Sequence, residues 1–171
     1  MSTLNEFPGC LIVCTSVHHG NTRKIAEVMT SAVGGALFSP GDEAREAAQG
    51  GALLGLGSGI YFGSHHHSLL AFAESLEPRA AHAAFLFSTS GTGDWLPRAI
   101  GLDYHRKLRC ILQRKGFMMV GEFMCRGVDT FGLWGMWGGI ARGHPNEGDV
   151  ERARAFAGAL IRTERVVQEP D

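Results

Sequence analysis

The stretch that decides the fold is CLIVCTSVHHGNTRKIAEVMTSAV, residues 10–33. Its first five residues are continuously apolar, which is typical of a strand buried on both faces of a parallel sheet. From residue 21 onward apolar side chains recur at helical spacing, at Ile25, Ala26, Val28, Met29 and Ala32. The stretch therefore predicts a strand, a polar loop and a helix in immediate succession.

The polar loop lies at the mouth of the predicted helix. Backbone N–H groups at a helix N-terminus are unsatisfied donors, and with the helix dipole they favour an anion such as a phosphate. Ser16, Asn21 and Thr22 can add side-chain hydrogen bonds, and Gly20 permits a turn that a Cβ would obstruct. The alternative is a simple cap in which Asn21 or Thr22 satisfies the first amides. This loop alone supports both interpretations.

The remainder of the chain alternates strands with helices. Further strands are expected at residues 35–39, 52–62, 81–90 and 117–125, and further helices at residues 42–49, 68–76, 103–115 and 149–162. This alternation predicts a doubly wound three-layer α/β sandwich with a five-stranded parallel sheet. Ligands of such folds bind beyond the carboxyl ends of the strands, where strand order reverses. The loops after the first, third and fourth strands are therefore the candidate site.

The other two loops are also suited to a planar, polar ligand. GSGIYFGSHHH, residues 57–67, offers Tyr61 and Phe62 as stacking side chains, although both could instead complete the packing of the strand. STSGTGDW, residues 88–95, combines hydroxyls and glycines whose backbone N–H groups could bind a ring edge. The alternative there is a surface turn with Trp95 tucked beneath it. Neither a G-x-G-x-x-G fingerprint after the first strand nor a Walker A loop is present.

These three loops, in this order, resemble the FMN loops of the flavodoxin family, in its short-chain form. The resemblance implies a flavodoxin-like strand order of 2-1-3-4-5 and bound FMN. It assigns the phosphate to the first loop, stacking on the flavin ring to the second, and the pyrimidine edge with Trp95 as a second stacking partner to the third. The implied FMN-binding residues are Ser16, Val17, His18, His19, Gly20, Asn21, Thr22, Ile60, Tyr61, Phe62, Gly63, Ser88, Thr89, Ser90, Gly91, Gly93, Asp94 and Trp95.

The resemblance also implies two finer properties of the loops. A peptide in the region of Phe62 to Ser64 turns over when the flavin takes up a proton at N5, and Gly63 makes that rotation easy. His18 and His19 occupy positions where flavodoxins more often carry hydroxyl residues. An imidazole beside a phosphate would make binding depend on pH near its reference pKa of about 6.5.

Composition limits the classes of protein that this chain can belong to. Its 171 residues suit one domain, residues 1–171, with frayed ends at residues 1–8 and 164–171. No apolar run approaches the ~20 residues that span a bilayer, and residues 1–9 lack the basic and apolar parts of a secretion signal. We therefore expect no membrane span and a cytoplasmic location. The formal net charge of -1 argues against nucleic acid as a partner.

Three features carry no clear role in the sequence. The adjacent histidines His65, His66 and His67 rarely suit one metal ion, so no metal site is expected, and they could tune the flavin or contact a partner. The cysteines lack CxxC spacing and are expected to be inert thiols, namely Cys10, Cys14, Cys110 and Cys125. The aromatic loop from Cys125 to Asp149 could cover the cofactor, contact a partner or a second copy, or bury itself.

The resemblance favours a low-potential electron carrier between a reductase and an acceptor protein. No catalytic acid, base or nucleophile is expected, because the flavin would supply the chemistry. Flavodoxins are typically acidic, whereas this chain is nearly neutral, which affects potential and partner choice. The alternatives are an FMN-dependent quinone or protoporphyrinogen-type oxidoreductase and a binding protein of the same fold without flavin.

Overall fold

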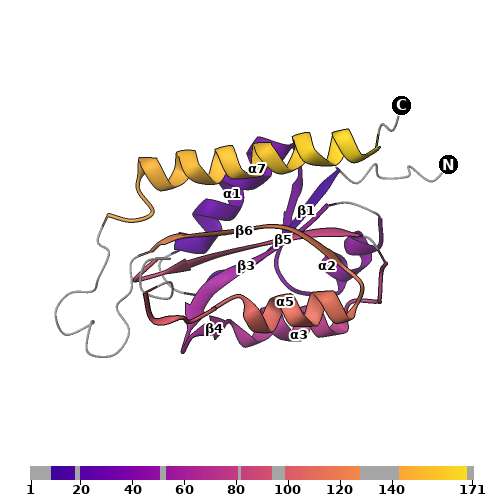
Figure 1. The fold of residues 1–171 in the computed structure, drawn as a ribbon, viewed down its shortest axis with the longest axis horizontal. Coiled ribbons are helices and arrows are strands. Elements are labelled where there is room, and N and C mark those ends of the chain that lie inside the picture. Colours follow the sequence, from indigo (N-terminus) through magenta and orange to yellow (C-terminus); the bar gives the residue numbers. More distant parts are fainter. Residues whose placement is uncertain are drawn as a thin grey trace.

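The computed structural model shows a three-layer α/β sandwich (Figure 1) and describes residues 9–17, 20–50, 53–80, 82–93, 99–127 and 143–168. The strands are β1 (Cys10–Thr15), β2 (Ala36–Phe38), β3 (Leu53–Tyr61), β4 (Ser64–His65), β5 (Ala83–Ser90) and β6 (Met118–Arg126). The helices are α1 (Asn21–Val33), α2 (Asp42–Ala47), α3 (His67–Ser75), α5 (Arg106–Arg114) and α7 (Glu147–Gln168), with a short 3-10 helix, η1 (Ala48–Gly50), after α2.

The main sheet is parallel and has the order β2-β1-β3-β5-β6. Without the short β4 this is the predicted order 2-1-3-4-5, so the predicted fold class is confirmed. The strand order reverses between β1 and β3, whose registers pair Thr15 with Ser58. The neighbouring β5 pairs Ser88 with Ser58, so the carboxyl ends of three strands meet at one edge. Figure 1 shows this edge at the left, near β4 and the start of α7.

Each face of the sheet has its own apolar core because successive side chains of a strand point to opposite faces. On one face Leu54, Leu56 and Leu86 pack against α2, α3 and α5. On the other face Ile12, Phe85 and Phe87 pack against α1 and α7. Figure 1 shows α1 and α7 together above the sheet and α3 and α5 together below it. The continuously apolar strands of the sequence are thus buried on both sides, as predicted.

Glycines in β3 make room for aromatic rings of β5. A Cβ built on Gly55 would overlap the ring of Phe85, and one built on Gly57 would overlap the ring of Phe87. Both rings are fully buried on the face covered by α1 and α7. In LLGLGSGIY glycine therefore occupies positions of β3 that face the large aromatic side chains of β5, and the leucines that alternate with it occupy positions on the opposite face.

Two elements differ from the sequence expectation. Residues 64–65 form a short antiparallel strand on β3, which the sequence analysis read as loop. The last helix begins at Glu147 and continues to Gln168, whereas the sequence predicted residues 149–162. The helix begins earlier because the Asn146 side chain accepts a hydrogen bond from the Asp149 N–H (3.0 Å), and the Asp149 carboxylate accepts one from the Asn146 N–H (3.0 Å).

Candidate functional site

The first loop leads into α1 through a glycine at the N-cap position. Gly20 is the N-cap of α1 in a left-handed conformation (φ 67°), and it makes no side-chain cap hydrogen bond. Thr22, which the sequence offered as a possible cap, instead places its hydroxyl 2.8 Å from that of Thr89 in β5. The buried Ser16 Oγ has no hydrogen-bond partner among the described residues. The N-cap residue therefore does not occupy the N-terminal amides of α1, which are of the kind that binds an anion.

Of the other first-loop residues, Val17 is exposed and Asn21 opens α1. His18 and His19 lie outside the described residues. Asn21 lies against Gly127, because a Cβ at Gly127 would come 3.0 Å from the Asn21 Nδ2. The segment after β6 therefore borders the helix mouth as well.

The second loop is a two-residue turn between β3 and β4. Tyr61 pairs with Ser64 and Ile60 with His65, so Phe62 and Gly63 occupy the tip. Both have positive φ, at 50° and 79° respectively, as a type I′ hairpin requires. The Phe62 side chain is 91% exposed, whereas the Tyr61 ring folds back against the ring of His66 (5.3 Å between centroids). Of the two predicted stacking side chains, Phe62 is thus the one displayed at the edge.

The third loop turns tightly after β5. Ser90 Oγ donates to the Gly93 carbonyl (3.1 Å), and Gly93 N–H donates to the Ser90 carbonyl (3.1 Å). Gly93 adopts a positive φ of 61° that favours glycine. Gly91 lies in the same turn, while Asp94 and Trp95 lie outside the described residues. This turn holds backbone groups in one fixed arrangement beside the helix mouth.

The predicted loops are joined by side-chain hydrogen bonds. Thr22 of α1 contacts Thr89 of β5, as described above, and Thr15 at the end of β1 lies 3.0 Å from Ser68 of α3 through their hydroxyls. Gly127 N–H donates to the Ser90 carbonyl (3.0 Å), which connects the end of β6 to the third loop. The structure therefore brings the described parts of all three predicted loops to one edge of the sheet.

Ser88 is the predicted site residue that faces elsewhere. Its hydroxyl is buried on the α3 and α5 side and lies 2.8 Å from His105 Nε2. The other ring nitrogen, His105 Nδ1, lies 3.0 Å from Glu122 Oε2 in β6. Because β5 side chains alternate between faces, Thr89 points to the helix mouth and Ser88 points to His105.

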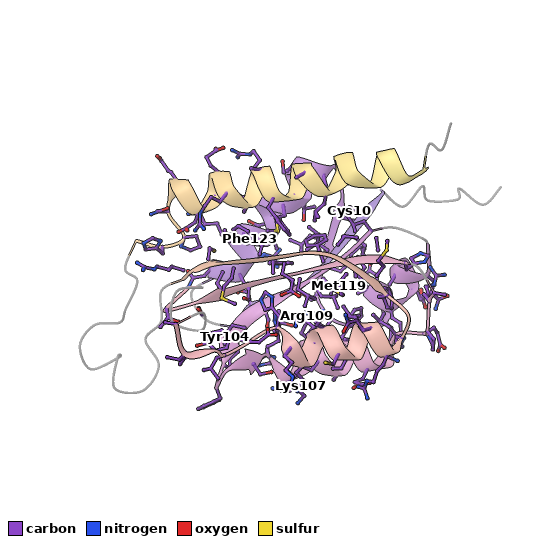
Figure 2. All side chains as sticks on the ribbon, in the orientation of Figure 1. Cys10, Tyr104, Lys107, Arg109, Met119 and Phe123 are labelled. Carbon is purple, nitrogen blue, oxygen red and sulfur yellow. The ribbon has the colours of Figure 1, made fainter. Side chains whose placement is uncertain are left out.

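Arg109 of α5 completes this polar group, and the sequence analysis missed it. Arg109 pairs with Glu122 (Nε to Oε1, 2.5 Å) and with Asp103 (2.7 Å). Figure 2 shows Arg109 on the side of α5 that faces the sheet and Lys107 on the opposite side. Burial alone would raise the pKa of Glu122, but hydrogen bonds from His105 and Arg109 lower it to about 2. Glu122 is therefore a carboxylate at neutral pH.

The adjacent histidines have three separate roles. His65 is buried in β4, and its Nδ1 lies 2.9 Å from Ser58 Oγ. His66 is the N-cap of α3 and accepts from the Ser68 N–H (3.3 Å). His67 is the exposed first residue of α3. One signal for the burial of His65 was present in the sequence. Ser58 follows Leu54 and Leu56 at alternate positions on the same face of its strand, so its buried hydroxyl needed a polar partner on that face.

The two cysteines nearest this edge are unreactive by environment. Burial raises the pKa of Cys14 and of Cys125 to about 12, so both remain protonated thiols. Among the described residues no group of three His, Cys, Asp or Glu side chains is arranged to hold a metal ion. No helix in the described ranges is long and apolar enough to cross a membrane.

Comparisons with known proteins identify the class. The sequence model of a flavodoxin domain matches residues 12–115. An uncharacterized protein of Methanocaldococcus jannaschii is 36% identical over 152 residues, covering 89% of this chain and 97% of the relative. The chain belongs to the flavodoxin family.

Solved structures agree on the fold. Oxidised flavodoxin 2 from Bacillus cereus superposes with a TM-score of 0.62 at 17% identity, covering 90% of this chain and 98% of that one. The flavodoxin, WrbA-like protein from Agrobacterium tumefaciens gives 0.61 at 15% identity, covering 92% and 98%. Rubredoxin oxygen:oxidoreductase from Desulfovibrio gigas gives 0.66 at 13% identity, covering 96% of this chain and 38% of that larger one.

Proposed function

We propose that this protein binds FMN at the carboxyl edge of its sheet and carries electrons between a reductase and an acceptor protein. The observation that carries the proposal is the mouth of α1, where the N-cap Gly20 makes no side-chain cap hydrogen bond, beside the buried Ser16 hydroxyl, which has no partner within the described part of the chain. The N-terminal amides of a helix and a buried hydroxyl without a partner in the described ranges both suit a phosphate. Membership of the flavodoxin family supports the choice of FMN.

Each of the three loops would bind a different part of FMN. Ser16, Asn21, Thr22 and the amides from Val17 to Thr22 would hold the phosphate, with His18 and His19 beside it. Phe62 would lie on one face of the flavin, next to Ile60 and Tyr61, and Trp95 on the other. Backbone groups from Ser88 to Asp94 would bind the pyrimidine edge. The buried hydroxyl of Ser64 also has no hydrogen-bond partner among the described residues and lies directly after the Phe62–Gly63 turn.

FMN would supply the one-electron and two-electron chemistry, and the chain would supply orientation and electrostatics. Gly63, at φ 79°, can reorient its peptide without a Cβ clash, so the turn can present either a carbonyl or an N–H to the ring edge. The phosphate end is held by α1, whose mouth is fixed to β5 through Thr22 and Thr89. The chain thereby combines a rigid phosphate end with an adjustable ring end.

The decisive experiment compares FMN with riboflavin, which lacks the phosphate. Asn21→Ala and Ser16→Ala should each weaken FMN about tenfold or more, the scale of one hydrogen bond to a charged group, and riboflavin less than about twofold. Thr30→Ala, in the last turn of the same helix, is the matched control and should change neither affinity. Equal losses for both ligands would contradict the phosphate assignment.

Reductive titration of the FMN-loaded protein then separates the functions. An electron carrier should give stepwise one-electron reduction and slow consumption of NAD(P)H in the presence of a quinone. Rapid turnover with a quinone would instead support an oxidoreductase. A purified chain that binds no FMN at micromolar concentration would overturn both and leave a binding protein of the same fold.

A further inference from the structure

His65 connects β4 to β3 through its side chain, on the buried side of the hairpin. It stands opposite Ile60 in the β3–β4 pairing, and its side chain turns inward so that the residue is 3% exposed. Ser58 is the fastening point, because its hydroxyl lies 2.9 Å from His65 Nδ1 and accepts a hydrogen bond from the His66 N–H (3.0 Å). His65 of β4 and the residue that follows the strand, His66, are therefore both held by one buried serine.

The hydrogen bonds of Ser58 define the proton on His65. The Ser58 hydroxyl donates its single proton to the Gly59 carbonyl (2.8 Å) and accepts from His66 N–H. Its remaining lone pair therefore accepts from His65 Nδ1–H. That leaves His65 Nε2 as an unprotonated nitrogen, buried and without a hydrogen-bond partner among the described residues. A second proton on this imidazole would have to enter at that position.

The surroundings of His65 disfavour such a proton. The ring stacks on His105, with centroids 5.0 Å apart and planes 29° apart. His105 lies 3.0 Å from the Glu122 carboxylate through Nδ1 and 2.8 Å from the Ser88 hydroxyl through Nε2, so both of its ring nitrogens have hydrogen-bond partners. Two carboxylates lie beside the pair. Glu122 from β6 contacts His105 Nδ1, and Asp103 accepts a hydrogen bond from the His105 N–H (3.1 Å). Arg109 from α5 binds both carboxylates.

The titratable groups that α3 places next to His65 are His66, which caps the helix, and His67, which is exposed. Burial, and then the proximity of His105, lower the pKa of His65 well below its ordinary value of 6.5, against a smaller opposing effect of Glu122. Neutral His65 is therefore the form that fits the closed hairpin.

We propose that His65 is a positioning residue that closes the β3–β4 hairpin only as a neutral imidazole, so that acid opens the hairpin and releases a ligand held by its tip. In the open hairpin His65 is hydrated and takes up a proton at Nε2 with an ordinary pKa of about 6.5. In the closed hairpin it takes up none until the pH is far lower. The ratio of closed to open hairpin is thus constant above about pH 6.5 and falls by up to about tenfold per pH unit below it. Release of FMN by this movement rests on the proposed function, whereas the opening of the hairpin does not.

Hydrogen exchange of the FMN-free chain tests the opening directly. The protection factor of the His66 amide should be constant from pH 7.5 to 6.5 and then fall by up to about tenfold per pH unit. The Leu56 amide, in the middle of β3, is the internal reference and should stay flat over the same range. His65→Asn retains a donor at the position of Nδ1 without a titratable group, and it should abolish the fall. His67→Asn, an exposed histidine two residues away, is the matched control and should behave as wild type.

Two outcomes would overturn the proposal: a His66 protection factor that is flat in the wild type, or one that falls equally in His65→Asn. Should His65→Asn not fold, the wild-type profile still decides between these results. A second arm measures riboflavin affinity against pH, since riboflavin lacks the phosphate that itself titrates. Affinity should decline below pH 6.5 in the wild type and not in His65→Asn. If no flavin binds at any pH, the proposed function fails while the exchange result stands.

Discussion

The hydroxyls of Thr22 and Thr89 lie 2.8 Å apart although 67 residues separate them in the chain. Both side chains are buried, at the point where the mouth of α1 meets the end of β5. The bond joins the loop proposed for the phosphate to the loop proposed for the flavin edge. It therefore fixes the distance between two parts of the candidate site.

Removing one hydroxyl of this pair should destabilise the fold. Thr22→Val keeps the shape of the side chain but leaves Thr89 Oγ1 buried without its partner, at a cost of about 1–2 kcal/mol in free energy of unfolding. Thr89→Val should cost a similar amount, and the double variant should cost clearly less than the sum. Urea unfolding measures all three. Thr30→Val removes only a hydroxyl that donates to Ala26 within α1, and should change stability by less than about 0.5 kcal/mol. Additive losses would show that the hydroxyls do not interact.

The glycine and phenylalanine pairs of β3 and β5 give a second prediction. Gly57→Ala should lower the free energy of unfolding by about 1–3 kcal/mol because its Cβ would enter the space of the Phe87 ring. In a Phe87→Leu background the same change should cost less, which thermal or urea unfolding can show. Gly158→Ala is the contrasting variant, since the interior of α7 has open space there and the change should stabilise by about 0.5–1 kcal/mol. A Gly57→Ala protein as stable as wild type would disprove the close packing.

The order of the strands could be predicted because it depends on local patterns. Continuous apolar runs such as residues 10–14 indicate buried parallel strands, and helices between them impose right-handed crossovers. The positions of the three loops followed from that order. Thr22, Thr89 and Ser90 were predicted as neighbours of a common ligand, and the structure places their side chains at one edge.

The hairpin and the group around His105 could not be predicted in the same way. Phe62 at φ 50° is a conformation that a phenylalanine adopts only when surrounding pairs impose it, so local preference pointed to ordinary strand or loop. The approach of Glu122 to His105 depends on the register of β6 on β5, which shifts at Ala84 and Phe85 and brings Glu122 opposite Leu86. Nothing in a single sequence specifies such a shift.

Glu122 gives a prediction about acid stability. Its pKa is lowered to about 2 in the folded protein, from about 4.5, so its contribution to stability is present above pH 4.5 and is lost as pH falls toward 2. Glu122→Gln should therefore flatten the decline of stability over that interval. At pH 7 the loss should be about 1 kcal/mol, because the group is partly exposed and solvent screens its ion pair.

The measurement for Glu122 is urea unfolding at several pH values. Glu74→Gln breaks an ion pair with Arg114 in which both side chains are exposed, and should cost no more than about 0.5 kcal/mol. An unchanged decline in Glu122→Gln would mean that other carboxylates account for the acid sensitivity. Asp103, which shares Arg109 and whose pKa is also lowered, chiefly by its hydrogen bond to Arg109, would be the next to test.

Phe62 combines an unfavourable backbone with an exposed ring, so two substitutions can separate its contributions. Phe62→Gly and Phe62→Ala both remove the ring, but only glycine relieves the positive φ of 50°. The glycine variant should be more stable than the alanine variant by about 1 kcal/mol in urea unfolding.

If the ring stacks on the flavin, both variants should weaken FMN and riboflavin equally, by up to about tenfold, because stacking contributes about 0.5–1.5 kcal/mol. Phe62→Trp keeps a planar face and should retain wild-type affinity. Unchanged affinity in the alanine variant would show that Phe62 serves another surface, and unequal losses for the two ligands would place the ring near the phosphate instead.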